Sequence, residues 1–284
     1  MAAVVHRRPA VDPATVLPTP PTPRTAFRRR YGVPYDTQGP RLRIGVLWAL
    51  SVAVALAFRP LRPYGLATLY GVVAGLAAVQ VVDAWNEVRA GADRWVAALT
   101  ASALPVVATL GVGPVGGVLI ATVVIAVAAA TRRPNRGVPL FSAAGHTVLA
   151  AGVCGGATAA LVLLADYEIG AVIILVVLVM AYDACDYLVG SGADNGIEGP
   201  LAGMLFMAAI TSVLAVLNVP PFRGVDIWSF AVLAMVACPA GQLLASAMLP
   251  RGDVRAPALR RLDSLLLVAP AWAALVGLYL QHVT

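Results

Sequence analysis

Four carboxylates stand close together in one short stretch of the sequence. Asp183 and Asp186 lie three residues apart at the end of an apolar run, and the glycine-rich stretch after it carries Asp194 and Glu198. A spacing of three residues places both aspartates on one face of a helix. Because the whole chain has only 14 acidic residues, this concentration indicates a site that uses negative charge.

Two aspartates at the end of an apolar helix need a counter-charge. An ionised carboxylate near the centre of a membrane costs about 2.5 to 3.5 kcal/mol, and the cost falls toward the interface. A divalent cation, arginine side chains or a shared proton could each compensate for the charge. Magnesium suits the pattern, because it binds through one or two carboxylates and bridges to phosphates. In the alternative interpretation the aspartates lie at the headgroup level, in water or paired with Arg260 or Arg261.

The glycine-rich stretch itself could bind phosphate. Residues 190–196, which include Asn195, can offer backbone amides to an anion, and Glu198 opens the next helix at its positive end. An ordinary glycine-rich turn has the same composition.

The last third of the chain holds a second set of polar residues in apolar surroundings. Gln242 and Ser246 share one face of an apolar helix. Asp263 and Ser264 open the last apolar helix, where they are either part of a site or a plain N-cap.

The composition indicates that these residues are positioned by a helical membrane domain. Apolar residues make up 60% of the chain and charged residues 12%, and the mean hydropathy is +0.84. A helix needs roughly 20 apolar residues to cross the hydrocarbon core. We therefore expect an all-α, polytopic transmembrane helical bundle that forms one compact membrane domain.

The apolar runs predict about nine transmembrane helices. They cover residues 44–58, 64–85, 95–112, 114–130, 139–165, 169–189, 199–217, 227–249 and 264–282. The tight connection at 111–114 could make residues 95–130 a broken hairpin. This pattern divides the chain into a disordered, proline- and arginine-rich cytoplasmic tail (1–43), N-terminal transmembrane helices (44–165) and a C-terminal transmembrane region (166–284).

Glycine pairs at four-residue spacing suit close helix packing within such a bundle. They are Gly71 with Gly75, Gly152 with Gly156, and Gly199 with Gly203.

The arginines predict the orientation of the chain. The net charge of +6 comes entirely from arginine, because the chain has no lysine. With the N terminus inside, 17 of the 20 arginines fall on the cytoplasmic side and 3 outside. This split predicts an N-in, C-out protein with an odd number of helices, integral to the cytoplasmic membrane. We therefore interpret the positive charge as a topology signal and expect no nucleic-acid partner.

The order of the polar motifs resembles that of the CDP-diacylglycerol synthases (phosphatidate cytidylyltransferases). The Asp-Thr-x-Ala-Tyr-x-x-Gly segment of that family resembles residues 183–190 here, and its Lys-Thr-x-Glu-Gly-x-x-Gly-Gly segment resembles 195–203. Its Gly-Asp-Leu-x-x-Ser-x-x-Lys-Arg segment resembles 241–251, and its Leu-Asp-Arg-x-Asp-Ser-Leu segment resembles 259–265. The resemblance covers about residues 170–282.

This resemblance implies an enzyme of phospholipid biosynthesis. Such an enzyme joins CTP and phosphatidate, a membrane lipid, to give CDP-diacylglycerol and pyrophosphate. The expected catalytic residues are Asp183, Glu198 and Asp263. Mg²⁺ would be held by Asp183, Asp186 and Asp263, and the phosphates would be bound by Arg251, Arg260, Arg261, Ser246 and Asn195.

The chain departs from the family pattern at two positions that bear on catalysis. Gln242 replaces the aspartate of Gly-Asp-Leu, and Arg260 replaces the aspartate of Leu-Asp-Arg. Lysines are missing throughout, and the stretch between the last two motifs has shrunk to residues 252–258. A cation inside a two-metal site opposes the second metal ion directly.

Three hypotheses follow for the function. The first is a membrane nucleotidyltransferase that acts on CTP, or another nucleotide, and a lipid phosphate. The second is a catalytically lapsed relative that acts as a lipid-binding or assembly subunit. The third is a small transporter in which the carboxylates relay protons. A homo-oligomer is compatible with all three.

Overall fold

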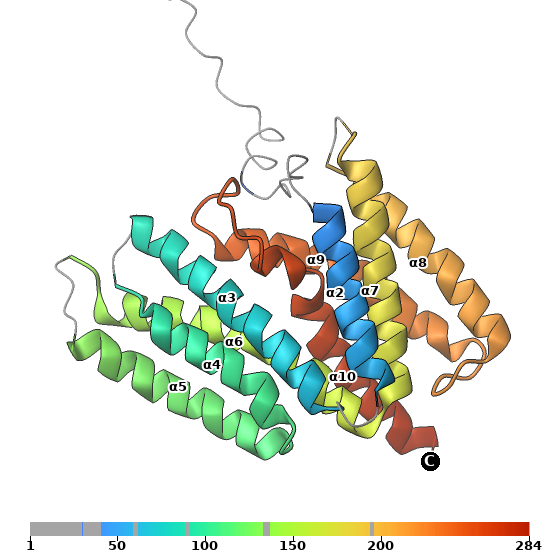
Figure 1. Ribbon diagram of the computed structural model, residues 1–284, viewed down its shortest axis with the longest axis horizontal. Coiled ribbons are helices and arrows are strands. Elements are labelled where there is room, and N and C mark those ends of the chain that lie inside the picture. The colour runs from blue at the N-terminus through green and yellow to red at the C-terminus, as the bar shows by residue number, and fades with distance from the viewer. Residues whose placement is uncertain are drawn as a thin grey trace, which may run out of the picture.

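The chain folds into a bundle of helices, described here from a computed structural model (Figure 1). The structure describes residues 30, 41–58, 62–88, 91–132, 137–193 and 196–283, which include no strand. Most of the predicted tail therefore lies outside the described residues. The helices are α2 (Arg41–Ala57), α3 (Tyr64–Val88), α4 (Arg94–Ala108), α5 (Val112–Arg132), α6 (Leu140–Tyr167), α7 (Ile169–Gly190), α8 (Glu198–Leu217), α9 (Asp226–Met248), the short 3₁₀ helix η3 (Leu259–Arg261) and α10 (Leu265–Val283).

The prediction of an all-helical membrane protein is confirmed. Each apolar run of the sequence lies largely within a helix, and seven of the described helices are long and apolar enough to cross a membrane. Two further apolar helices are shorter, Gly45–Ala57 within α2 and Arg94–Ala108. Residues 95–130 form two separate helices, α4 and α5, joined through Gly111 at a φ of +105°. A residue without a side chain suits this left-handed turn.

The helices form two packed groups that meet in a common core. Helices α3, α4, α5 and α6 pack against one another, and α7 packs against α8 (Figure 1). Helix α10 packs on both α6 and α9, and α2 lies along α7.

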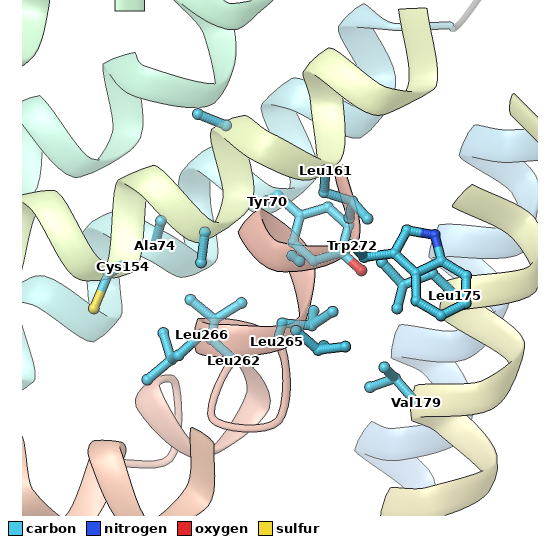
Figure 2. Close-up of a cluster of buried hydrophobic side chains, with 14 of the residues drawn as sticks. Tyr70, Ala74, Cys154, Leu161, Leu175, Val179, Leu262, Leu265, Leu266 and Trp272 are labelled. Carbon is cyan, nitrogen blue, oxygen red and sulfur yellow. The ribbon is translucent and has the colours of Figure 1, made fainter. Parts of the chain in front are cut away.

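Side chains from distant parts of the sequence meet in this core. Figure 2 shows Tyr70 and Leu161 beside Leu175, Leu266 and Trp272, which come from α3, α6, α7 and α10. These five side chains are at most 3% exposed. The predicted N-terminal and C-terminal regions therefore share one hydrophobic core.

Glycines allow close helix approach at several crossings. A Cβ added at Gly71 would meet the Ser102 carbonyl oxygen at 2.9 Å, and one at Gly75 would meet the Ala98 carbonyl oxygen at 3.2 Å. The Gly71 and Gly75 pair therefore packs tightly on α4, as predicted.

In α6 the close approach falls on a different glycine from the predicted pair. A Cβ at Gly155 would lie 2.6 Å from Leu104 Cδ1 and 2.9 Å from Ala101 Cα, whereas a Cβ at Gly156 would meet nothing within 4 Å. The prediction of Gly152 with Gly156 was therefore wrong, because the spacing of glycines does not show which face of the helix contacts a neighbouring helix.

These two adjacent glycines give a matched test of the packing. We expect Gly155→Val to lower the free energy of unfolding by about 1 to 3 kcal/mol, as overpacking does in well-packed interiors. Gly156→Val makes the same change in helix propensity without the clash, so it should leave the midpoint of thermal unfolding in detergent nearly unchanged. Equal midpoints for the two variants would contradict the packing of α6 on α4.

Candidate functional site

A cavity of about 340 Å³ lies between α2, α3, α7, α9 and the segment 260–265. Its polar lining includes Asp183, Asp186, Gln242, Arg260, Arg261 and Asp263. Its apolar lining includes Val46, Trp48 and Ala49 of α2 and Val176, Val179 and Met180 of α7. The cavity thus has a charged part and an apolar part, and it contains most of the polar residues that the sequence singled out.

Two local features bring the segment 260–265 against α7 and α9. A Cβ on Gly241 would overlap the main-chain carbonyl of Asp263, so only a glycine in α9 permits this approach. From α3, Gln80 Oε1 accepts hydrogen bonds from the amides of Ala258 at 2.9 Å and Leu259 at 3.4 Å. The start of η3 is therefore fixed by a side chain that is almost 180 positions earlier in the chain.

Asp183 and Asp263 are joined by a single hydroxyl group. Ser264 Oγ donates to Asp183 Oδ1 at 2.5 Å and lies 3.5 Å from Asp263 Oδ1, so the two carboxylate oxygens can be at most 6.0 Å apart. The Ser264 amide also donates to Asp263 Oδ1 at 2.8 Å. The structure thus brings together two carboxylates that are 80 residues apart in the sequence.

Asp186 is held by a buried chain of hydrogen bonds between α7 and α9. The Tyr182 hydroxyl donates to Gln242 Oε1 at 3.1 Å, and Gln242 Nε2 donates to Asp186 Oδ2 at 2.9 Å. The hydroxyl donor fixes which end of the amide faces the carboxylate. Asp186 is only 3% exposed, whereas Asp183 is half-buried at the cavity wall.

Arg260 places a positive charge inside this group of carboxylates. Its Nη1 lies 3.7 Å from Asp263 Oδ2, and its Nη2 donates to Ser246 Oγ at 3.0 Å. Its side chain is only 7% exposed. The adjacent Arg261 also lines the cavity, where its Nη1 lies 3.4 Å from the position of a Cβ on Gly45.

The remaining predicted site residues lie away from the cavity lining or outside the described residues. Glu198 begins α8 and is not among the cavity residues. Arg251 forms an ion pair with Asp253 at 3.6 Å, but the two side chains are 66% and 79% exposed. Such an exposed pair contributes little to stability. Asn195 and Asp194 lie outside the described residues.

The carboxylates of the cavity are engaged by protein donors. Asp183 accepts a hydrogen bond from Ser264, and Asp186 accepts one from Gln242. Asp263 forms an ion pair with Arg260. Among the described residues, no group of three or more His, Cys, Asp or Glu side chains is placed to hold a metal ion. Bound magnesium therefore stays a prediction.

The sequence did not indicate several residues that shape the site. Helix α2 contributes Gly45, Val46, Trp48 and Ala49 to the cavity, although its sequence shows only an apolar run. Tyr182 did offer a signal, because it is a hydroxyl-bearing residue next to Asp183 in an apolar helix.

The last turn of α9 is capped by side chains from elsewhere in the chain. Trp85 Nε1 donates to the Met248 carbonyl at 2.6 Å. Arg30 donates to the carbonyls of Ser246 at 2.8 Å and Leu249 at 2.9 Å. The last carbonyls of a helix lack the usual intrahelical partners. These donors therefore supply hydrogen bonds to Met248 and Leu249 and a second one to Ser246, whose carbonyl also accepts from the Leu249 amide.

The chain was compared with family models, curated proteins and solved structures. No family model, no curated protein and no solved structure matches this chain.

Replacing Gln242 tests the buried chain of hydrogen bonds. We expect Gln242→Leu to lower the free energy of unfolding by about 1 to 3 kcal/mol, because Tyr182 loses its acceptor and Asp186 loses a donor. Gln281→Leu, at an exposed position near the end of α10, makes the same chemical change outside the network. Thermal unfolding of the two variants in detergent should separate them, and a loss of the same size in both would argue against the network.

Proposed function

We propose that this chain is a membrane-embedded lipid-binding protein that resembles the CDP-diacylglycerol synthases and has lost nucleotidyl transfer. The observation that carries the proposal is the position of Arg260, whose guanidinium is buried beside Asp263. The cavity would bind the headgroup of a phospholipid without a metal ion.

The charge of Arg260 opposes a two-metal reaction. In the family that the sequence resembles, the matching position carries an aspartate, which would attract a metal ion. A fixed cation at that position repels an incoming divalent ion, and the repulsion is strong where water is excluded. Gln242 removes a second carboxylate and instead uses its amide to hold Asp186. Both departures therefore replace metal ligands with groups that compensate the remaining carboxylates.

The shape of the cavity supports a lipid ligand. Ligand pockets are mostly apolar with a few placed polar groups. Here the charges lie near the end of α7 and on the segment 260–263, with the neutral Gln242 of α9 beside them. The apolar wall is formed by α2 and the middle of α7. A lipid headgroup at the charged part would leave its glycerol and acyl chains against the apolar wall.

A second candidate function is the complete cytidylyltransferase reaction. It is favoured by Asp183 and Asp263, which share the hydroxyl of Ser264 although they are far apart in sequence. In this alternative Asp183, Asp186 and Asp263 would hold Mg²⁺, and Arg261 would bind a phosphate of CTP or of phosphatidate.

We further propose nine membrane crossings in the cytoplasmic membrane, with the N terminus inside. The 17 to 3 distribution of arginines supports this orientation. The charged part of the cavity then lies toward the cytoplasm, where it can meet the headgroups of the inner leaflet.

Activity measurements distinguish the two candidate functions. We expect the purified chain to release no pyrophosphate from CTP and phosphatidate with Mg²⁺. The double variant Gln242→Asp with Arg260→Asp restores the family residues, and we expect it to bind Mg²⁺ at least about tenfold more tightly than the parent, because a repelling cation becomes a ligand. Pyrophosphate release by the parent chain that is lost in Asp183→Ala would overturn the proposal.

Reporter fusions test the proposed orientation. A periplasm-active phosphatase fused after residue 284 should be active, and a fusion in the loop 250–258 should be inactive, because the two positions lie on opposite sides of the membrane. A cytoplasm-active fluorescent reporter should give the reverse pattern. The same reporter response at both positions would rule out the N-in, C-out topology with nine crossings.

A further inference from the structure

We propose that the cavity binds a ligand group with neighbouring hydroxyls, as in a glycerol, inositol or sugar headgroup, and that Tyr70 and Asp183 form hydrogen bonds with these hydroxyls. The inference rests on the proposed lipid-binding function and names the chemical class of the headgroup. Free polyols offer the same hydroxyl chemistry, so both sources are tested.

The first observation is a buried tyrosine hydroxyl that lacks a hydrogen-bond partner. Tyr70 of α3 is 1% exposed and lines the cavity. Its ring packs edge to face on Trp48 with centroids 5.2 Å apart, but its hydroxyl forms no hydrogen bond with any residue that the structure describes. Figure 2 shows the hydroxyl oxygen at the end of the ring toward Leu265 and Val179, which line the same cavity.

The fold satisfies the other fully buried tyrosine hydroxyl of this region. Tyr182 is 0% exposed and donates to Gln242 Oε1 at 3.1 Å. A buried hydroxyl without a partner costs free energy, and most buried polar groups are therefore paired. The hydroxyl of Tyr70 is the exception, and it lies where a ligand in the cavity can pair with it.

The second observation is an oxygen of Asp183 that is open to the same cavity. Asp183 is half-buried at the cavity wall, and Ser264 Oγ donates to its Oδ1 at 2.5 Å. Within the described part of the chain, Oδ2 of Asp183 receives no hydrogen bond. A carboxylate oxygen only accepts hydrogen bonds, so its partner in a ligand must be a donor.

Hydroxyl groups satisfy both of these side chains at once. A hydroxyl donates one hydrogen bond and accepts others, so neighbouring hydroxyls can donate to Asp183 and accept from Tyr70. A phosphodiester has only acceptors and offers nothing to Asp183. An ammonium has only donors and leaves the proton of Tyr70 without an acceptor.

The rest of the cavity suits the carbon skeleton and the size of such a group. Trp48 and Tyr70 supply aromatic surface, and both residues also carry a polar group at the edge of the ring. The cavity volume of about 340 Å³ is near the lower limit for small-molecule sites. This volume fits one headgroup better than a lipid phosphate together with a nucleotide.

The experiment compares short-chain lipids of equal charge that differ in their hydroxyls. Full-length protein in amine-oxide detergent, which carries no hydroxyl, is titrated calorimetrically in EDTA with dihexanoyl phosphatidylglycerol, phosphatidylinositol and phosphatidylmethanol. Each headgroup has one phosphodiester charge, and phosphatidylmethanol has no hydroxyl. We expect at least one hydroxyl-bearing lipid to bind about tenfold more tightly than phosphatidylmethanol, as one or two new hydrogen bonds imply. Free glycerol and myo-inositol are titrated in parallel.

Matched variants place this preference at the cavity. Tyr70→Phe removes one hydroxyl and keeps the aromatic ring, so we expect it to weaken binding of the preferred lipid about fivefold and to leave phosphatidylmethanol unchanged. Asp183→Asn keeps an acceptor for Ser264 but replaces the second acceptor with a donor, so it should also reduce the preference. Tyr167→Phe removes a hydroxyl that donates to the Ala273 carbonyl, away from the cavity lining, and should leave every affinity unchanged.

Thermal unfolding without added lipid gives an independent readout. Tyr182→Phe removes a hydroxyl that donates to Gln242, so we expect it to lower the midpoint. Tyr70→Phe removes a hydroxyl without a partner in the protein, so its midpoint should equal or exceed that of the parent. A midpoint lowered as far in Tyr70→Phe as in Tyr182→Phe would overturn the inference, because the hydroxyl would then be paired within the fold.

The outcomes separate this inference from the function on which it rests. Equal affinities for the three lipids would overturn the inference and leave lipid binding standing. A hydroxyl preference that survives both Tyr70→Phe and Asp183→Asn would also overturn it, because the selectivity would then lie elsewhere. Free glycerol or inositol that binds as tightly as its lipid, with the same loss in Tyr70→Phe, would support the hydroxyl site and overturn the lipid function. If the parent chain binds none of the lipids and polyols, the inference and the proposed function fall together.

Discussion

Buried carboxylates in an apolar helical bundle must be compensated from within the protein, and the geometry of the cavity follows from this constraint. Asp186 and Asp263 are 3% and 4% exposed, so water cannot screen them. Gln242 and Arg260 supply the donor and the cation. Removing one partner of a buried ion pair typically costs about 3 to 5 kcal/mol. The carboxylates, α9 and the 3₁₀ turn are therefore energetically interdependent.

Two residues outside the ion pair, Gly241 and Gln80, place Arg260 beside its carboxylate. Gly241 lets α9 approach Asp263, and Gln80 anchors the amides at the start of η3. Both position Arg260 relative to its carboxylate. An internal guanidinium cannot dissociate as a metal ion can, so this positive charge stays in the site.

The helices could be predicted from the sequence because apolar runs leave little choice within a membrane. The grouping of Asp183 with Asp263 was also predictable, since the spacing and order of the motifs carried it. The wall formed by α2 was not, because an apolar helix shows nothing in its sequence about which neighbour it covers. The choice of Gly155 over Gly156 is equally a tertiary fact, decided by the direction in which α4 crosses α6. The contact of Arg260 with Ser246 needed the fold, since Ser246 lies on α9, whereas Asp263 is only three positions from Arg260 in the sequence.

Ser246 joins the start of the chain to the cavity. Its carbonyl accepts from Arg30, and its hydroxyl accepts from Arg260. A truncation that removes Arg30 would take away its hydrogen bonds to the last turn of α9. This turn includes Ser246, whose hydroxyl holds the guanidinium of Arg260. Expression designs that trim the N-terminal tail should therefore keep Arg30, and a fusion partner is better attached ahead of it than in its place.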